Sequence, residues 1–213
     1  KIIRKMIKKK FCIVGVDPDF NQLIFENKKN YIGLITNFGH KKYHINNKVL
    51  GKETLSDWIK IKKKFNPSVI IAINDGVQRR ILSAIYKKNL INYIDKTVQI
   101  DRTTFASIKN RKGIFINKLS YISSDVEIDD GVKIHVRCNV HHHVKIEKFV
   151  TLSPCSIILG GARIGENSFI GSGSIINPNI KIGKNCMIGS GSVVTKDVAD
   201  NLTVFGVPAR IKD

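Results

Sequence analysis

The sequence predicts an α/β N-terminal domain with a small parallel sheet, followed by a parallel β-helix. In residues 1–91, short apolar runs typical of strands alternate with amphipathic segments typical of helices. From Ile116 to Val194 an aliphatic residue recurs every six residues without an insertion, which is the signature of a β-helix. Residues 92–113 follow neither pattern. We therefore expect a small α/β domain (1–91), a crossover (92–113), a β-helix (114–194) and a C-terminal tail (195–213).

In the first domain, strands and helices alternate. We expect strands at 11–16, 31–36 and 68–73 and helices at 55–65 and 77–88. The apolar positions expected to face the sheet are Leu55, Trp58, Ile61 and Phe65 in the first helix, and Ile81, Leu82 and Ile85 in the second. Strands joined through helices run parallel, and the ends of such strands form a crevice for a ligand.

The repeat places two columns of residues inside the β-helix. The aliphatic column is Ile116, Ile122, Ile128, Ile134, Val140, Ile146, Leu152, Ile158, Ile164, Ile170, Ile176, Ile182, Ile188 and Val194. Two residues before each lies a smaller or β-branched residue, among them Ser120, Cys138 and Ile180. Two inward residues separated by an outward one make a short strand, and the other three positions turn a corner. Glycine and asparagine suit corners where φ is positive.

Composition limits the class of protein. The net charge of +19 fits phosphate binding, but the lysines are spread over both halves, and abundant Lys, Ile and Asn also fit an AT-rich coding sequence. We expect no specific nucleic-acid partner, although a basic surface steers small polyanions. There is no apolar run of about 18 residues and no secretory pattern, so we expect no membrane span. The four scattered cysteines favour reduced thiols and a cytoplasmic location.

Three consecutive histidines, His141, His142 and His143, stand out within the repeat. Their neighbours Val140 and Val144 point inward, so the histidines lie outside or at a corner. One interpretation is a solvated corner. A second is a metal site, which we do not expect within one chain because adjacent side chains diverge, although a symmetry axis would gather three copies. The third is a general base, since imidazole titrates near pH 6.5.

Several segments together resemble one known family. They are the repeats, the short α/β domain before them, Ile94-Asp95-Lys96-Thr97, Asn139–Pro154 (NVHHHVKIEKFVTLSP) and the terminal Gly206-Val207-Pro208-Ala209-Arg210. They resemble the sialic acid O-acetyltransferase and nucleotide-amino-sugar N-acetyltransferase family of bacterial surface-glycan enzymes. The resemblance implies a left-handed parallel β-helix, acetyl-CoA as co-substrate and no required metal. It also implies a homotrimer with its sites between neighbouring coils.

Matched residue by residue, the family's catalytic base falls on His142, which would deprotonate the sugar amine or hydroxyl. The acidic residue that often follows it falls on His143, a departure, and both are our candidate catalytic residues. The resemblance also implies a set of acetyl-CoA-binding residues: Thr151, where the family has a later histidine, and Gly160, Gly161, Gly171 and Gly173.

The first domain departs further from the family. Its glycine-rich turn for nucleotide phosphates reads Gly15-Val16-Asp17-Pro18-Asp19-Phe20 here, and its acidic pair reads Thr36-Asn37. The segment from Ala72 to Arg79 keeps the arginine of the family's third-strand motif. Gly15 and Arg79 are therefore our candidate substrate-binding residues. Three functions stay open: N-acetylation of a nucleotide-linked amino sugar, O-acetylation of a sialic acid-type sugar, and a catalytically degenerate scaffold.

Overall fold

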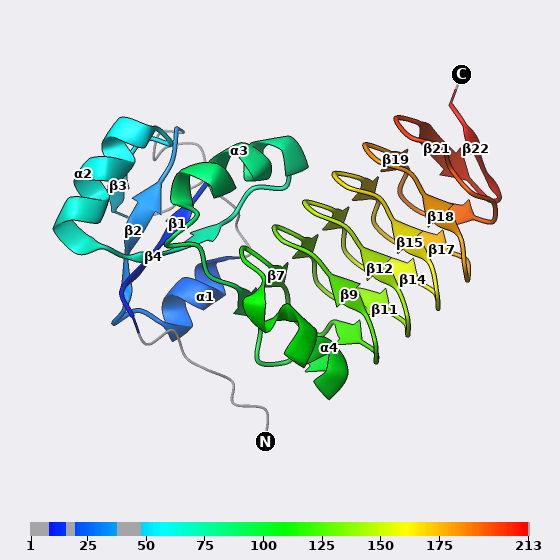
Figure 1. Cartoon of the computed structure of the whole chain (residues 1–213), viewed down its shortest axis with the longest axis horizontal. Coiled ribbons are helices and arrows are strands. Elements are labelled where there is room, and N and C mark those ends of the chain that lie inside the picture. The colour runs from blue at the N-terminus through cyan, green and yellow to red at the C-terminus, as the bar shows by residue number, and fades with distance from the viewer. Residues whose placement is uncertain (1–8, 16–19, 38–47, 213) are drawn as a thin grey trace. The chain divides into compact units, whose positions relative to one another are not determined.

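The structure, a computed structural model, describes residues 9–15, 20–37 and 48–212. It divides into two compact units, one of residues 1–74 and 78–91 and the other of residues 75–77 and 92–213 (Figure 1). Among the described residues, no helix has the length and apolar character needed to cross a bilayer.

The first unit contains a four-stranded, all-parallel sheet in the order β3-β2-β1-β4. Its strands are β1 (Phe11–Val14), β2 (Tyr31–Ile35), β3 (Val49–Gly51) and β4 (Ser68–Ile71). Its helices are α1 (Asn21–Glu26), α2 (Leu55–Phe65) and α3 (Gly76–Tyr86), the last of which belongs to this unit from Gln78 onward. The pattern of alternating elements therefore predicts the parallel sheet, while the short α1 and β3 have no clear signal in the sequence.

The inward faces of the two longer helices differ from those expected. In α2, Trp58 is buried as expected, but Leu55 is 58% exposed because it is the first residue after the N-cap Thr54. In α3 the buried residues are Arg79, Leu82 and Tyr86, and Ile81 is 56% exposed. The expected inward role of Leu55 and Ile81 is therefore wrong. Leu82 is buried and Ile85 packs against the core as expected, while the apolar pattern missed Arg79 because it is a charged residue.

The second unit is a parallel β-helix of two-residue strands spaced six residues apart. They are β7 (Phe115–Ile116), β8 (Tyr121–Ile122), β9 (Glu127–Ile128), β10 (Lys133–Ile134), β11 (Asn139–Val140), β12 (Lys145–Ile146), β13 (Thr151–Leu152), β14 (Ile157–Ile158), β15 (Arg163–Ile164), β16 (Phe169–Ile170), β17 (Ile175–Ile176), β18 (Lys181–Ile182), β19 (Met187–Ile188) and β20 (Val193–Val194). Every third strand joins the same sheet, and partners are 18 residues apart, as in Lys133 with Thr151.

Each of the three sheets of the β-helix is named after one of its strands. The β10 sheet contains β7, β10, β13, β16 and β19, the β11 sheet contains β8, β11, β14, β17 and β20, and the β12 sheet contains β9, β12, β15 and β18. Each coil of the chain passes through the three in turn. The corner that follows β11 therefore leads into the β12 sheet.

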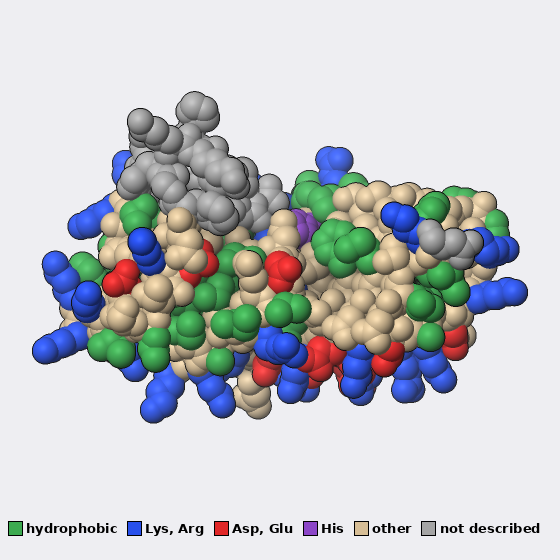
Figure 2. Space-filling view, turned by 90° about the horizontal axis from the view of Figure 1, so that it is seen from above, with side chains coloured by type: hydrophobic (Ala, Val, Ile, Leu, Met, Phe, Trp, Pro, Cys, Tyr) green, Lys and Arg blue, Asp and Glu red, His purple; other side chains and the backbone are tan. Residues whose placement is uncertain are grey.

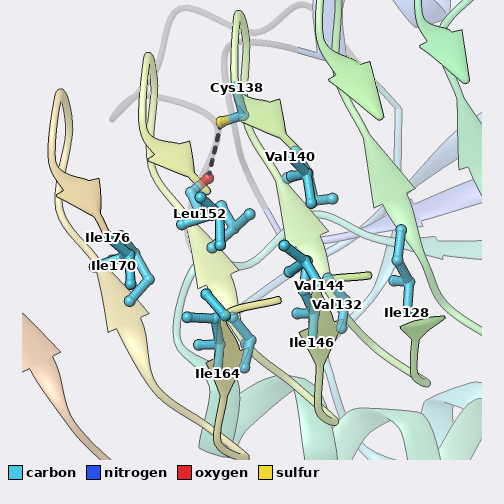
Figure 3. Close-up of a cluster of buried hydrophobic side chains, with 14 of the residues drawn as sticks. Ile128, Val132, Cys138, Val140, Val144, Ile146, Leu152, Ile164, Ile170 and Ile176 are labelled. Carbon is cyan, nitrogen blue, oxygen red and sulfur yellow. Dashed lines mark hydrogen bonds between the residues drawn. The ribbon is translucent and has the colours of Figure 1, made fainter. Parts of the chain in front are cut away.

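The interior of the β-helix is made by the two columns read from the sequence. All fourteen aliphatic positions are at most 3% exposed, and Figure 3 shows members of successive coils pointing into the same interior. The smaller column is buried too, with Ile180 half-buried as the exception. Serines fit this column because their hydroxyls are satisfied: Ser168 Oγ donates to Gly183 O at 2.7 Å and Ser174 Oγ to Gly189 O at 2.8 Å.

The first coil lies within the expected crossover. Strands β5 (Tyr93–Ile94) and β6 (Gln99–Ile100) pair with β7 and β8 at an offset of 22 residues, as in Tyr93 with Phe115. The offset exceeds 18 because helix α4 (Arg102–Ser107) and the 3-10 turn η3 (Ile108–Asn110) replace the third strand. The Thr104 hydroxyl, fully buried, donates to Ser123 O at 2.8 Å. Helix α4 therefore covers the first end of the core.

At the other end the repeat shortens. Ile182 pairs with Val198 and Ile188 with Val204, each 16 residues apart rather than 18. Strand β21 (Thr203–Gly206) runs parallel to β19, and β22 (Ala209–Ile211) returns antiparallel to β21. The tail thus ends in a hairpin stacked on the last coil (Figure 1).

Candidate functional site

The candidate catalytic histidines lie at the corner between β11 and β12. His142 and His143 are the two turn residues and are exposed, while Val140 and Val144 on either side are fully buried. The backbone is held by both neighbouring coils: Gly161 N donates to His142 O at 3.0 Å, and His143 N donates to Ser124 O at 3.3 Å. The β-helix therefore presents both imidazoles to solvent from a fixed corner.

The two imidazoles interact directly. His142 Nδ1 and His143 Nδ1 are 2.9 Å apart, and the rings meet edge to face with centroids 5.1 Å apart. A hydrogen bond between two Nδ1 atoms requires a proton on only one of them. If His142 carries it, His142 Nε2 keeps a free lone pair, and His143 must be neutral and accept at Nδ1. In that tautomer His142 is able to take a proton from a substrate.

Two of the five candidate coenzyme residues share the edge of His142. Gly160 and Gly161 form the corresponding corner one coil later, and Asn179 N donates to Gly160 O at 3.0 Å. A Cβ atom built on Gly160 would lie 2.7 Å from His142 Cε1 and 2.9 Å from His142 Nε2. Gly160 therefore lies directly against the His142 ring.

The other three candidates lie elsewhere on the coil. Thr151 begins β13 in the β10 sheet and is 2% exposed. Gly171 precedes the corner between β16 and β17, which joins the β10 sheet to the β11 sheet, and Gly173 is the second residue of that turn. At Gly171 an added Cβ would lie 2.5 Å from Ser190 N, so coil stacking alone favours glycine there. Within one chain the structure does not bring these residues to the His142 edge.

A cavity of about 260 Å³ lies at the end of the β-helix, beside the hairpin. It is lined by Val194, Lys196, Asp197, Val198, Leu202, Val204, Ala209, Arg210 and Ile211. Two cationic side chains, Lys196 and Arg210, therefore border a mainly apolar hollow. In the sequence, Arg210 stands out only as part of the tail motif, and no pattern marks Lys196.

The two candidate substrate residues support the loops at the ends of β1 and β4. Gly15 has φ of +86°, and a Cβ there would lie 2.4 Å from Ile73 Cγ1, so this position requires glycine. Arg79 is 2% exposed and donates to the carbonyl oxygens of Ile73 and Asn74. Its guanidinium thus stabilises the loop after β4. The altered turn at Val16–Asp19 lies outside the described residues.

Charge is distributed rather than concentrated. On the face shown in Figure 2, lysine and arginine side chains lie on both units, with acidic side chains among them. On the β12 sheet the outward column is Glu127, Lys145, Arg163 and Lys181, with a 3.1 Å ion pair between Lys145 and Glu127. Within the described residues, no group of three or more His, Cys, Asp or Glu side chains is placed to hold a metal ion.

Comparison with known proteins identifies the repeat. Residues 161–196 match the family model described as bacterial transferase hexapeptide (six repeats). A stretch of 69 residues is 51% identical to a galactoside O-acetyltransferase of Lactococcus lactis subsp. lactis, covering 32% of this chain and 25% of that relative. The chain therefore spans about a quarter of the length of the curated relative it matches.

The fold is that of solved acetyltransferase structures. The acetyltransferase domain of PglB from Neisseria gonorrhoeae, solved with acetyl coenzyme A, superposes with a TM-score of 0.80 at 19% identity, covering 96% of this chain and 100% of that one. PerB from Caulobacter crescentus, solved with CoA and GDP-perosamine, gives 0.72 at 20% identity, covering 98% and 100%. WeeI from Acinetobacter baumannii gives 0.72 at 22% identity, covering 96% and 100%. The expected fold, an α/β domain followed by a left-handed β-helix, is confirmed. Residues 161–196 thus carry the hexapeptide repeat of bacterial transferases, and the chain as a whole has the fold of these solved structures.

Proposed function

We propose that this protein is an acetyl-CoA-dependent acetyltransferase that acetylates the amino group of a nucleotide-linked amino sugar. The observation that carries the proposal is the exposed His142, whose Nδ1 is engaged by His143 and whose Nε2 is available. Supporting it is the likeness in fold to PerB, which was solved with CoA and GDP-perosamine. We further propose that the reaction serves bacterial surface-glycan synthesis in the cytoplasm.

In the proposed reaction, His142 acts as a general base. The acceptor nitrogen attacks the carbonyl carbon of the acetyl thioester, and His142 Nε2 takes the proton that the nitrogen loses. As the C–S bond breaks, the same proton passes to the departing CoA sulfur, so the histidine is regenerated. His143 accepts a hydrogen bond from His142 Nδ1–H throughout, which holds the ring and stabilises the imidazolium. This is the role that a carboxylate has in the related family.

We propose that acetyl-CoA binds the β-helix and its tail. Gly160 and Gly161 offer close backbone approach beside His142, because neither carries a side chain. The cavity suits a coenzyme because its lining is mainly apolar and its charged residues, Lys196, Arg210 and Asp197, leave a net positive charge.

A homotrimer would explain why the candidate residues occupy two edges. The β11 sheet carries a mainly apolar outward column, in contrast to the charged column of the β12 sheet. Its members are Tyr121, Asn139, Ile157, Ile175 and Val193, of which all but Asn139 are apolar. Packing this column against a second copy would place that copy beside the His142 corner. We propose that Thr151, Gly171 and Gly173 contribute to a site completed by a neighbouring subunit.

A second candidate function is O-acetylation of a sugar hydroxyl. The 51% identity to a galactoside O-acetyltransferase over 69 residues favours it, and a hydroxyl also needs a base such as His142. A scaffold without turnover is the third alternative, and it need not bind acetyl-CoA.

The test measures thiol release from acetyl-CoA with GDP-perosamine, sialic acid and galactosides as separate acceptors. We expect turnover with the nucleotide amino sugar, and a 10²–10⁴-fold loss in His142→Ala, the range for removal of a general base. His141→Ala is the matched control and should be nearly silent, while His143→Ala should give an intermediate loss. Full activity of His142→Ala would overturn the assignment of the base. Turnover with a galactoside or sialic acid alone would favour the O-acetyltransferase, and absence of acetyl-CoA binding would favour the scaffold.

Assembly is tested by sedimentation, which should give three times the 23.9 kDa of one chain. A fully active monomer would refute the shared site.

A further inference from the structure

Gly160 is unusual among the corners of the β-helix. Each corner from Lys118 to Gly191 is a two-residue turn, and the second residue of every turn has a positive φ near +60° to +70°. No first residue has a positive φ, so this position accepts any side chain. The other first residues are Lys118, Ser124, Asp130, Val136, His142, Lys148, Pro154, Glu166, Ser172, Pro178, Lys184 and Ser190. The backbone of a corner therefore does not require glycine at Gly160.

The His142 ring occupies the space that a side chain at position 160 would fill. The three atoms nearest to a Cβ built on Gly160 are His142 Cε1, Nε2 and Nδ1, at 2.7, 2.9 and 3.2 Å. At Gly165 and Gly171 the nearest atoms belong instead to the backbone of the next coil. Gly160 therefore differs from Gly165 and Gly171 in that the atoms nearest to a Cβ built on it belong to one imidazole.

The ring is bounded on more than one side. His143 engages Nδ1 at 2.9 Å, and Gly161 N fixes the carbonyl of His142 at 3.0 Å. Gly160 closes the side toward the next coil. We propose that Gly160 is a positioning residue: the absence of its side chain lets the His142 ring rest against the backbone, with Nε2 directed by the hydrogen bond to His143. This inference rests on the proposed role of His142 as the base.

An added methyl group would move the ring at little cost in folding energy. The ring is exposed and rotates about two bonds, so Gly160→Ala displaces it rather than the backbone. A base displaced by about 1 Å is enough to lower the rate by about 10²-fold. We therefore expect Gly160→Ala to lower kcat by about 10–100-fold, in addition to any rise in KM from its place in the proposed coenzyme site, with the unfolding transition nearly unchanged.

A double-mutant cycle on kcat tests the coupling. Gly160→Ala should lower kcat in the wild-type background and have no further effect in His142→Ala. Lys184→Ala, at the same position of another corner, is the control and should leave kcat unchanged. If Gly160→Ala lowers kcat equally in both backgrounds, or raises KM alone, Gly160 acts through the coenzyme and the proposal is wrong.

A second measurement does not depend on turnover. In ¹⁵N-labelled protein, the wild-type His142 Nδ1 signal should report the hydrogen bond to His143, and Gly160→Ala should shift the signals of the His142 ring. Unchanged ring signals in Gly160→Ala would overturn the proposal whatever the activity. Shifted signals with unchanged kcat would refute the catalytic consequence. If His142→Ala is fully active, the proposed base is wrong. The contact between Gly160 and the His142 ring is then tested by the spectra alone.

Discussion

Phe149 and Lys148 occupy one corner and should respond in opposite directions to the same pair of substitutions. Phe149 is the second turn residue and has φ of +59°, whereas Lys148, the first, does not have a positive φ. A left-handed conformation costs a residue with a Cβ atom roughly 1–2 kcal/mol. Only 9% of Phe149 is exposed, however, and its ring packs against Gly131. A Cβ atom built on Gly131 would lie 2.3 Å from Phe149 Cδ1. Burial of the ring therefore offsets the backbone cost.

The sizes of these free-energy terms decide whether glycine or alanine is the more stable substitution at each position. Phe149→Ala removes the ring and keeps the strained backbone, at about 3–5 kcal/mol. Phe149→Gly also relieves about 1–2 kcal/mol of strain, and loses about 0.4–1 kcal/mol through the greater entropy of the unfolded chain. Glycine should thus be more stable than alanine at this position by about 0.5–1 kcal/mol. At Lys148 the order reverses, with glycine less stable than alanine by about 0.5–1 kcal/mol.

Urea unfolding of the four variants, followed by circular dichroism at one protein concentration, gives the four free energies of unfolding. Because alanine and glycine are compared at the same position, the free energy lost with the original side chain cancels. The reasoning is refuted if alanine is as stable as glycine at Phe149, or if both positions show the same order.

Three further outcomes are expected. Burial opposes the ionisation of Asp95, but the hydrogen bonds that it accepts from Thr97 and Tyr93, together with the charge of Lys118, outweigh it and lower its pKa from 3.8. Its carboxylate therefore stabilises the fold above that pH and ceases to do so as the pH falls through the lowered pKa, so Asp95→Asn should cost about 1–3 kcal/mol at pH 7, and the cost should shrink as the pH falls through the lowered pKa in pH-dependent unfolding. Burial raises the pKa of Cys138 to about 11, so a thiol reagent at pH 8 should modify the exposed Cys155 first; equal labelling rates in a mass-spectrometric time course would contradict this. Arg79→Met should destabilise the first unit by about 1–3 kcal/mol, because two backbone carbonyls lose a charged donor, and an unchanged denaturation midpoint would argue against that role.

The β-helix was predictable because its pattern repeats. An aliphatic residue every six positions has one simple explanation, and all fourteen such residues are buried. The outward position of His142 followed from the inward position of Val140 and Val144. The contact of Gly160 with the His142 ring was not predictable from glycine counts, because it depends on which side chain lies one coil earlier.

The α/β unit was harder because its signals are short and mixed. Strands β1, β2 and β4 were evident from their apolar runs and β3 was not, and the buried face of α3 includes Arg79, whose charge is satisfied by backbone carbonyls. Apolar periodicity has no means of recognising a buried cation. Helix α4 was missed for a related reason: it caps the core with six residues, Arg102–Ser107, most of them polar or small.

The hairpin of β21 and β22 has a consequence for how molecules of this kind stay separate. In a β-helix, the backbone groups at the edge of each coil pair with the next coil. At the last coil the same groups have no coil to pair with, so a second molecule is able to continue the stack. Here β22 runs antiparallel to β21, with Gly206 facing Ala209 and Val204 facing Ile211. A parallel coil cannot continue across that reversal in the repeating register. Removing β22 should therefore expose the parallel edge of β21 and promote association through that end of the β-helix, which sedimentation would detect as a larger particle; an unchanged particle mass would contradict this.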